Sequence, residues 1–191
     1  MRCLTGAECA AYLTVHGVNF DSDDFYAGFI DSTPAPPAVG GAADSPRIRS
    51  AGLTLSPPSS DAEQFQLVTA LFNAAPPRSS WMIWLLEWGL WSGGFDAVWM
   101  ALREGSGESR PIIEAPGHLF GADEAELAAE MVRLALASSF DAHLVSIPAA
   151  VVAYTSHDEY MEVYTPESSS LKALGAILES LALRPRYSRQ T

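Results

Sequence analysis

The sequence predicts a single α/β or α+β domain over residues 1–191, a sandwich in which helices pack on a mixed sheet of about five strands. Two observations predict this fold. Segments with helical periodicity alternate with short apolar runs through the middle of the chain, and the strand-like runs cluster toward its end. With 191 residues and 48% hydrophobic side chains, the chain has the length and composition of one domain with its own core.

A first helix is predicted to begin after Thr5 and to stop at Gly17. Thr5 and Glu8 have the spacing of a capping box, in which each side chain accepts a hydrogen bond from the other residue's backbone amide. Residues 31–46, rich in Pro, Gly, Ala and Ser, predict a surface loop. We expect an insertion rather than a linker, because residues 1–30 are too few to bury a core by themselves.

A strand and a helix are predicted next. Residues 47–55 alternate well enough for a strand, and prolines follow them. Ser60 and Glu63 repeat the capping-box spacing. The side chains predicted to form the buried face of this helix recur at i, i+3, i+4 and i+7, and they are Phe65, Val68, Thr69 and Phe72. The pair Pro76-Pro77 ends the unit.

A continuous apolar run at residues 80–86, with sequence breakers on either side, predicts a strand covered on both faces. Gly93-Gly94 follows the run. Helical spacing then resumes with Phe95, Val98, Trp99 and Leu102. Ile112-Ile113 predicts a short strand that leads into a turn at Pro116-Gly117.

The last part of the chain contains two predicted helices and three predicted strands. Asp123 and Glu126 form a third capping pair, which opens a helix. The buried stripe of this helix is predicted to contain Leu127, Met131, Leu134 and Ala135. The strands are predicted at residues 141–147, 149–156 and 160–165, and the final helix is predicted to bury Leu171, Leu174, Leu178 and Leu181. Residues 184–191 are basic and are predicted to be a frayed tail.

The charge of the chain argues against nucleic-acid and membrane partners. The net charge of −12 arises from 23 acidic and 11 basic residues, and such a surface repels phosphates and anionic lipids. The longest apolar stretch, residues 81–91, contains Glu87 and is too short to cross a bilayer. A basic protein partner is therefore favoured.

Cysteine usage and the N-terminal sequence predict a cytoplasmic location. Cys3 and Cys9 are six residues apart, too far along a helix axis to form a disulfide, and no other cysteine is present. The N-terminal residues contain no continuous apolar run like that of a secretion signal.

Chemical motifs are few, and the sequence favours a binding protein over an enzyme. It contains no GxSxG elbow, Walker loop, HExxH or CxxC motif, and no cofactor is predicted. His16 is expected to lie at the end of the first helix. Asp141 and His143 share a face if their strand is regular, and form either an orienting pair or a simple hydrogen-bonded pair. His118 is predicted in a turn, where it bonds either to the local backbone or to Glu114.

The triplet His157-Asp158-Glu159 stands between two strand-like runs. In one continuous strand, His157 and Glu159 would share a face, and a metal ion would need a third ligand from another histidine. In a hairpin, residues 156–159 would form the tip, with Ser156 and Asp158 as ordinary turn residues. In a short helix, Ser156 would be the cap. The aromatic and β-branched residues that follow favour strand over helix.

Three sets of candidate site residues result. The candidate catalytic residues are His118, His157, Asp158 and Glu159, and the candidate metal ligands are His118, His157 and Glu159. The candidate partner-binding residues are Trp88, Trp91, Asp158, Glu159 and Glu162. The two tryptophans stand at the end of the apolar run, among five indoles that are otherwise expected to be mostly core.

Four motifs, EWGLW, EAPGHLF, FDAHL and SHDEY, follow one another within residues 81–165. Their order resembles that of a family of uncharacterised bacterial proteins. The family has no established activity, so the resemblance implies no role for any residue. It singles out Trp88, His118, His157, Asp158 and Glu159.

Three functions are compatible with the sequence. The leading hypothesis is a non-enzymatic cytoplasmic binding protein, immunity- or adaptor-like, whose acidic surface engages a basic protein. The first alternative is a metal-dependent or general acid/base hydrolase that uses the candidate catalytic residues. The second is a structural subunit of a larger assembly, including a homo-oligomer, built through the tryptophan-rich surface.

Overall fold

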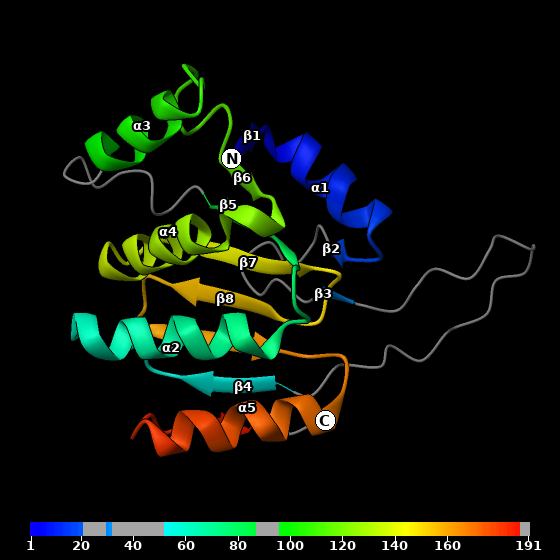
Figure 1. Ribbon diagram of the computed structural model, residues 1–191, viewed down its shortest axis with the longest axis vertical. Coiled ribbons are helices and arrows are strands. Elements are labelled where there is room, and N and C mark those ends of the chain that lie inside the picture. The colour runs from blue at the N-terminus through cyan, green and yellow to red at the C-terminus, as the bar shows by residue number, and fades with distance from the viewer. Residues whose placement is uncertain (21–29, 32–51, 87–95, 188–191) are drawn as a thin grey trace, which may run out of the picture.

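A computed structural model describes residues 1–20, 30–31, 52–86 and 96–187 of the chain, and its main element is one eight-stranded sheet (Figure 1). The strands of this sheet are β1 (Arg2–Leu4), β4 (Gly52–Leu55), β5 (Ser80–Leu85), β6 (Gly117–Phe120), β7 (Ala142–Ile147), β8 (Val152–Ser156), β9 (Tyr160–Tyr164) and β10 (Arg186–Tyr187). A separate ribbon pairs β2 (Asn19–Phe20) with β3 (Ile30–Asp31).

All neighbouring strands of the large sheet are antiparallel, in the order β1-β6-β5-β7-β8-β9-β4-β10. The general α/β class is confirmed, but the expected mixed sheet of fewer strands is wrong. The added edge strands β1 and β10 have only three and two residues. Segments this short cannot show an alternating pattern, and they are strands because of the partners beside them.

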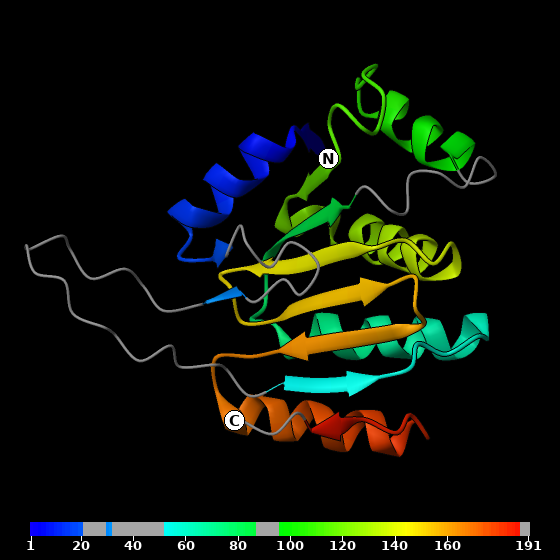
Figure 2. The ribbon, with the colours of Figure 1, turned by 180° about the vertical axis from the view of Figure 1, so that it is seen from behind.

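The described parts of the chain form five α-helices, which cover the two faces of the sheet unequally. They are α1 (Gly6–Val15), α2 (Asp61–Ala74), α3 (Asp96–Gly105), α4 (Ala125–Ala137) and α5 (Ser168–Ser180), and a 3-10 turn, η2 (Ala122–Glu124), precedes α4. Helices α2, α4 and α5 lie on one face (Figure 1), and α1 lies on the other (Figure 2). The larger core includes Leu67 and Leu174, and the smaller core under α1 includes Leu13 and Met82.

Strand β5 confirms the prediction of a strand covered on both faces. Trp81 and Ile83 belong to the larger core, whereas Met82 belongs to the core under α1, and all three are at most 2% exposed. Gly117 of β6 lets α1 approach this part of the sheet closely. A Cβ atom at Gly117 would lie 2.0 Å from the sulfur of Cys9, so only glycine fits there.

Two of the three predicted capping pairs are present. The Thr5 hydroxyl accepts a hydrogen bond from the Glu8 amide at 3.2 Å, and the Glu8 carboxylate accepts one from the Thr5 amide at 2.7 Å. Ser60 caps α2 by accepting from the Glu63 amide at 3.3 Å. Helix α1 ends as expected, with His16 at its C-cap and Gly17 at φ +78°.

The predicted Asp123–Glu126 cap is wrong. Glu124 takes the capping role instead, because its carboxylate accepts a hydrogen bond from the Gly121 amide at 2.9 Å. The same carboxylate also binds the amino group of Met1. This ion pair joins the start of β1 to the entrance of α4, a contact that local spacing cannot reveal.

The predicted buried face of α2 is right for Val68 and Phe72, which belong to the core or pack against it, and wrong for Phe65 and Thr69, which are exposed. Phe65 is 54% exposed and its ring lies 5.8 Å from the Arg133 guanidinium carbon. The buried side chains of α2 are Gln64, Leu67, Val68, Ala70 and Leu71. Helix α2 packs against α4 and α5, and its buried stripe is centred on Leu67, Val68 and Leu71.

The buried stripes of the later helices agree better with prediction. Met131 and Ala135 of α4 are buried, as are Leu171, Leu174 and Leu178 of α5 and Trp99 of α3. Leu102, Leu127, Leu134 and Leu181 are partly buried, whereas Val98 is 48% exposed.

The predicted strand at Ile112-Ile113 is a turn. Ile112 is buried and Ile113 is 63% exposed, and the strand begins later, at Gly117. The basic segment at residues 184–191 is not wholly frayed, because Arg186–Tyr187 form β10 and pair with β4. Residues 32–46 of the predicted loop lie outside the described residues.

Cys3 and Cys9 are both buried free thiols, in agreement with the expectation that they do not pair. Within the described ranges, no helix combines the length and the apolar character needed to cross a bilayer.

Candidate functional site

One end of the sheet collects several polar side chains. The registers of β5, β7 and β8 place Leu85 opposite Ala142 and Ala142 opposite Thr155. Leu55 at the end of β4 lies opposite Met161 near the start of β9. The ends of β4 and β5, the start of β7 and the turn between β8 and β9 therefore meet at the same end of the sheet, on the left in Figure 1.

The triplet at residues 157–159 is the tip of a β-hairpin. Ser156 pairs with Tyr160 across the tip, and the Glu159 amide donates to the Ser156 carbonyl at 3.1 Å. The Ser156 hydroxyl accepts from the Asp158 amide at 3.2 Å. The hairpin alternative is therefore the conformation that the chain adopts, and Asp158 stands out from it with a side chain that is 72% exposed.

Glu159 occupies a backbone conformation that favours glycine. Its φ is +60°, the left-handed position that three-residue hairpin loops usually fill with glycine. A non-glycine residue held there carries roughly 1 to 2 kcal/mol of strain. An acidic residue therefore occupies a tip position at which the backbone conformation favours glycine.

We expect Glu159→Gly to be more stable than Glu159→Ala by about 1 kcal/mol in urea unfolding. Both substitutions remove the carboxylate, but only glycine releases the strain at φ +60°. Equal unfolding free energies for the two variants would contradict the assignment of strain to this residue.

A buried carboxylate holds the hairpin tip. Asp141, 2% exposed, accepts a hydrogen bond from the His157 amide at 2.6 Å. Both of its carboxylate oxygens lie 3.0 Å from His157 Nδ1. On the other side of the ring, His157 Nε2 lies 3.5 Å from an Asp158 carboxylate oxygen. His157 is thereby fixed between one buried and one exposed carboxylate.

The expected pairing of Asp141 with His143 is wrong. Asp141 precedes the first residue of β7, so the alternation of a regular strand does not apply to it. The β7–β8 register instead brings it level with the end of β8, beside His157. The His143 ring lies on the sheet face opposite α2, α4 and α5, with its centroid 5.2 Å from that of Tyr154.

We expect Asp141→Ala to lower the free energy of unfolding by about 2 kcal/mol, because the His157 amide and ring lose a charged acceptor inside the protein. Asp141→Asn, which keeps one oxygen for the His157 amide, should cost about half as much. Urea unfolding of both variants tests this. A cost within error of zero for the alanine variant would contradict a structural role for Asp141.

His118 is buried in the sheet rather than placed in a turn. It is 0% exposed, lies 3.0 Å (Nε2) from Arg103 Nη1, and packs against Trp99 with ring centroids 5.0 Å apart. Burial and the Arg103 guanidinium lower the pKa of His118 to about 3. Glu114 is exposed in the preceding turn, so the alternative of a Glu114–His118 pair is not realised, and His118 contacts Arg103 instead.

The candidate catalytic residues do not converge. His118 on β6 and the β8–β9 tip are separated by three strand spacings, roughly 14 Å, because β5 and β7 lie between them. His157, Asp158 and Glu159 remain together at the tip. No group of three potential metal ligands occurs in the part of the chain that the structure describes, so its geometry offers no metal centre there.

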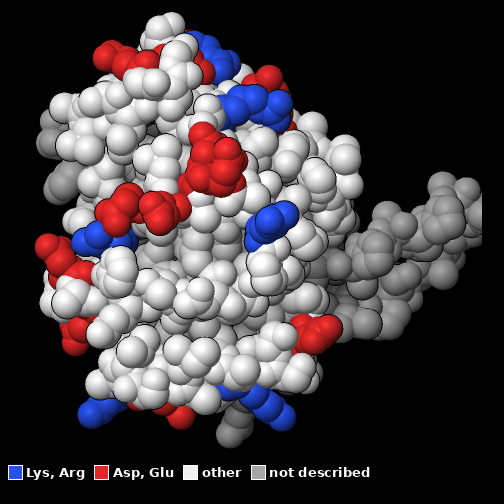
Figure 3. All heavy atoms as spheres, in the orientation of Figure 1, with Lys and Arg blue, Asp and Glu red and all other residues white. Residues whose placement is uncertain are grey.

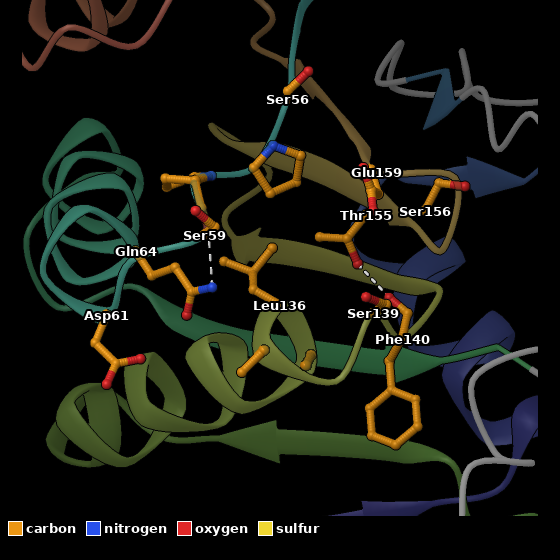
Figure 4. Close-up of a pocket in the computed structure, with 14 residues that line it drawn as sticks. Ser56, Ser59, Asp61, Gln64, Leu136, Ser139, Phe140, Thr155, Ser156 and Glu159 are labelled. Carbon is orange, nitrogen blue, oxygen red and sulfur yellow. Dashed lines mark hydrogen bonds between the residues drawn. The ribbon is translucent and has the colours of Figure 1, made fainter.

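A pocket of about 470 Å³ opens beside the tip (Figure 4). Its lining residues are Ser56, Pro57, Pro58, Ser59, Asp61, Gln64, Ala135, Leu136, Ala137, Ser139, Phe140, Thr155, Ser156 and Glu159. Asp61 and Gln64 come from α2 on one side, Thr155 and Glu159 from the hairpin on the other. Among the residues that the structure describes, the lining includes two carboxylates and no Lys, Arg or His.

Sequence reasoning missed Asp61, Gln64 and Asp141 as site residues. Asp61 and Gln64 follow a helix cap, where polar residues need no further explanation. Asp141 was noted only as a neighbour of His143. Its contact with His157 spans 16 residues and depends on the strand register.

The candidate partner-binding residues divide into three groups. Asp158 and Glu159 are at the tip, whereas Glu162 is partly buried on β9 and accepts a hydrogen bond from the Tyr164 hydroxyl at 2.6 Å. Trp88 and Trp91 lie outside the described residues. Acidic side chains also line the left edge of the view in Figure 3, where β4 and β8 end.

Comparison of the chain with protein-family models, with curated proteins and with solved structures finds no match. The site is therefore interpreted from its own geometry.

Proposed function

We propose that this chain is a non-enzymatic cytoplasmic binding protein, immunity- or adaptor-like, that engages a basic protein through the β8–β9 tip. The observation that carries the proposal is the exposed Asp158 carboxylate at a tip fixed from below by Asp141. The net charge of −12 adds a field that attracts basic partners over longer distances.

A fixed tip suits recognition because little side-chain and loop freedom is lost on binding. The His157 amide and ring are both held by Asp141, and the two following amides are bonded to Ser156. Asp158 and Glu159 therefore project from a turn whose backbone is already ordered. Carboxylates presented in this way favour specific charge pairing and fast association with a basic surface.

Co-purification of the tagged protein from its native host tests the proposal. We expect a basic protein to be retained by the wild type and lost from Asp158→Lys plus Glu159→Lys. Glu104→Lys plus Glu179→Lys is the matched control, because it changes the net charge equally at exposed residues of α3 and α5. Absence of a basic partner, or its equal retention by the tip variant, would contradict the proposal.

The second candidate function is a general acid/base hydrolase, and the Asp141–His157 contact favours it. A buried carboxylate against Nδ1 orients an imidazole as acid–base catalysis requires. Ester, phosphate and peptide substrates can be screened with wild type and His157→Gln. Turnover that the substitution abolishes would establish this function and displace the binding proposal.

A further inference from the structure

The pocket beside the tip, defined by the lining residues given above, has an unmatched hydrogen-bond acceptor in its wall. Gln64 is only 6% exposed, and its side-chain amide donates to the Pro58 carbonyl at 3.0 Å. Because a carbonyl can accept only from the NH₂ group, this bond fixes the amide orientation. Its oxygen accepts no hydrogen bond from the described residues, and Figure 4 shows Gln64 extending from α2 toward Leu136 in the hollow.

The Gln64 oxygen has no donor among the described residues, so a ligand N–H group that reaches it from the pocket can donate to it. The other bonded polar groups of the wall do not supply one. The Thr155 hydroxyl donates to the Phe140 carbonyl at 2.7 Å, and the Ser156 hydroxyl accepts from the Asp158 amide. The Gln64 oxygen therefore remains available to a ligand N–H group, and the hydroxyls of Ser56, Ser59 and Ser139 also line the pocket.

The charge of the pocket wall favours a cationic ligand. Asp61 and Glu159 contribute two carboxylates, and none of the described basic side chains lines the pocket. Asp61 stands in the first turn of α2, where the helix dipole favours a negative charge. The C-terminal end of α4 also faces the pocket through Ala135–Ala137, and the partial charge at that end is negative.

Part of the remaining lining is apolar and suits an alkyl chain, whereas Ser56, Ser59 and Ser139 are polar. Leu136, Phe140, Pro57 and Pro58 provide carbon surface beside the polar groups. Arginine and lysine side chains combine an apolar stem with a cationic head that donates hydrogen bonds. The volume of about 470 Å³ accommodates such a side chain.

We propose that this pocket binds an arginine or lysine side chain of the protein partner, an inference that rests on the proposed function. The alkyl stem lies along Leu136 and the prolines. The cationic head lies near the Gln64 oxygen, in the field of the Asp61 and Glu159 carboxylates on the two sides of the pocket. The strained Glu159 thus serves both the tip and the pocket.

The test is a titration of the whole protein with N-acetyl-arginine amide and N-acetyl-lysine amide, followed by NMR. N-acetyl-citrulline amide is the control, since it matches arginine in shape but is neutral. We expect both cations to shift the Gln64 side-chain amide and the Thr155 and Glu159 backbone amides, with citrulline binding about tenfold more weakly. Binding of citrulline as tightly as arginine, or shifts produced by sulfate instead, would overturn the inference.

Two substitutions test whether arginine binds in this pocket. Glu159→Gly removes one carboxylate without adding backbone strain, and Asp61→Asn removes the other. Glu63→Gln is the matched control, because Glu63 lies in the same turn of α2 but not in the pocket wall. We expect each pocket variant to weaken arginine binding about fivefold and the control to leave it unchanged. Unchanged affinity in both pocket variants would overturn the inference.

The two proposals fail in different ways. If reversal of the tip charges abolishes partner binding but the pocket binds neither arginine nor lysine, the pocket proposal is contradicted and the proposed binding function still holds. Arginine bound in the pocket of a protein that retains no partner would support the pocket and overturn the binding function.

Discussion

Replacing Arg103 by alanine is expected to lower the free energy of unfolding by about 4 kcal/mol. Arg103 is 0% exposed, and its guanidinium donates to the carbonyls of Ala115 at 2.6 Å and Arg110 at 2.8 Å. These bonds tie the end of α3 to the segment that leads into β6. Alanine would leave the carbonyls without donors and open a cavity next to His118 and Trp99.

Urea unfolding of Arg103→Ala, Arg103→Lys and Arg133→Ala measures this effect. Lysine should recover less than half of the loss, because one ammonium group cannot reach both carbonyls in the geometry of a guanidinium. Arg133 is partly exposed and pairs with Glu130 on the same helix, so its removal should cost less than about 1 kcal/mol. Equal losses for Arg103→Ala and Arg133→Ala would contradict the role of Arg103.

Acidification from pH 7 to pH 5 is expected to lower the free energy of unfolding by about 3 kcal/mol through two buried histidines. Burial and Arg103 lower the pKa of His118 to about 3, and burial lowers the pKa of His143 to about 4. In the unfolded chain both titrate near pH 6.5. The stability they provide is present above pH 6.5 and is lost as the pH falls toward their folded pKa values, because the unfolded state binds protons first.

Urea unfolding at several pH values, compared between wild type and His143→Gln, checks this expectation. The variant should lose roughly half of the pH dependence between pH 7 and pH 5, since one of the two titrating groups is gone. Carboxylates contribute little in this window because their unfolded pKa values are near 4. A wild-type stability that stays constant from pH 7 to pH 5 would contradict the neutral, buried state of both histidines.

The sequence was informative where a segment carries its own pattern. The apolar run of β5, the Thr5 and Ser60 caps and the leucine stripe of α5 are local signals, and the structure contains all of them. The edge strands β1 and β10 were not predictable, because each depends on a neighbour distant in sequence. Phe65 and Thr69 of α2 have the same helical spacing as the buried Val68, so the period alone did not reveal that they are exposed.

The site was also predictable only in part, because some of its contacts join residues that are distant in the sequence. The aromatic and β-branched residues after the triplet favoured strand over helix, and Asp158 lies exposed at a tip. The register of β7 and β8 places Asp141 beside His157, and the spacing of residues in the sequence does not indicate that register. The proline near His118 indicated a turn, which made this histidine a candidate site residue. His118 instead lies in β6 beside Arg103.

The tip, its buried support and the adjoining pocket form one surface at the end of the sheet. Asp141 holds the turn from the inside, and Asp158 and Glu159 present charge on the outside. Binding of a basic partner by this surface is the central claim.

The most direct test is the dissociation constant of the co-purified partner, measured by calorimetry at low and high salt. We predict that salt weakens wild-type binding about tenfold or more, because charge pairs at a solvent-exposed tip are screened. Asp158→Lys plus Glu159→Lys should bind weakly at both salt concentrations, whereas Glu104→Lys plus Glu179→Lys should follow the wild type. An affinity that changes neither with salt nor with reversal of the tip charges would contradict the claim.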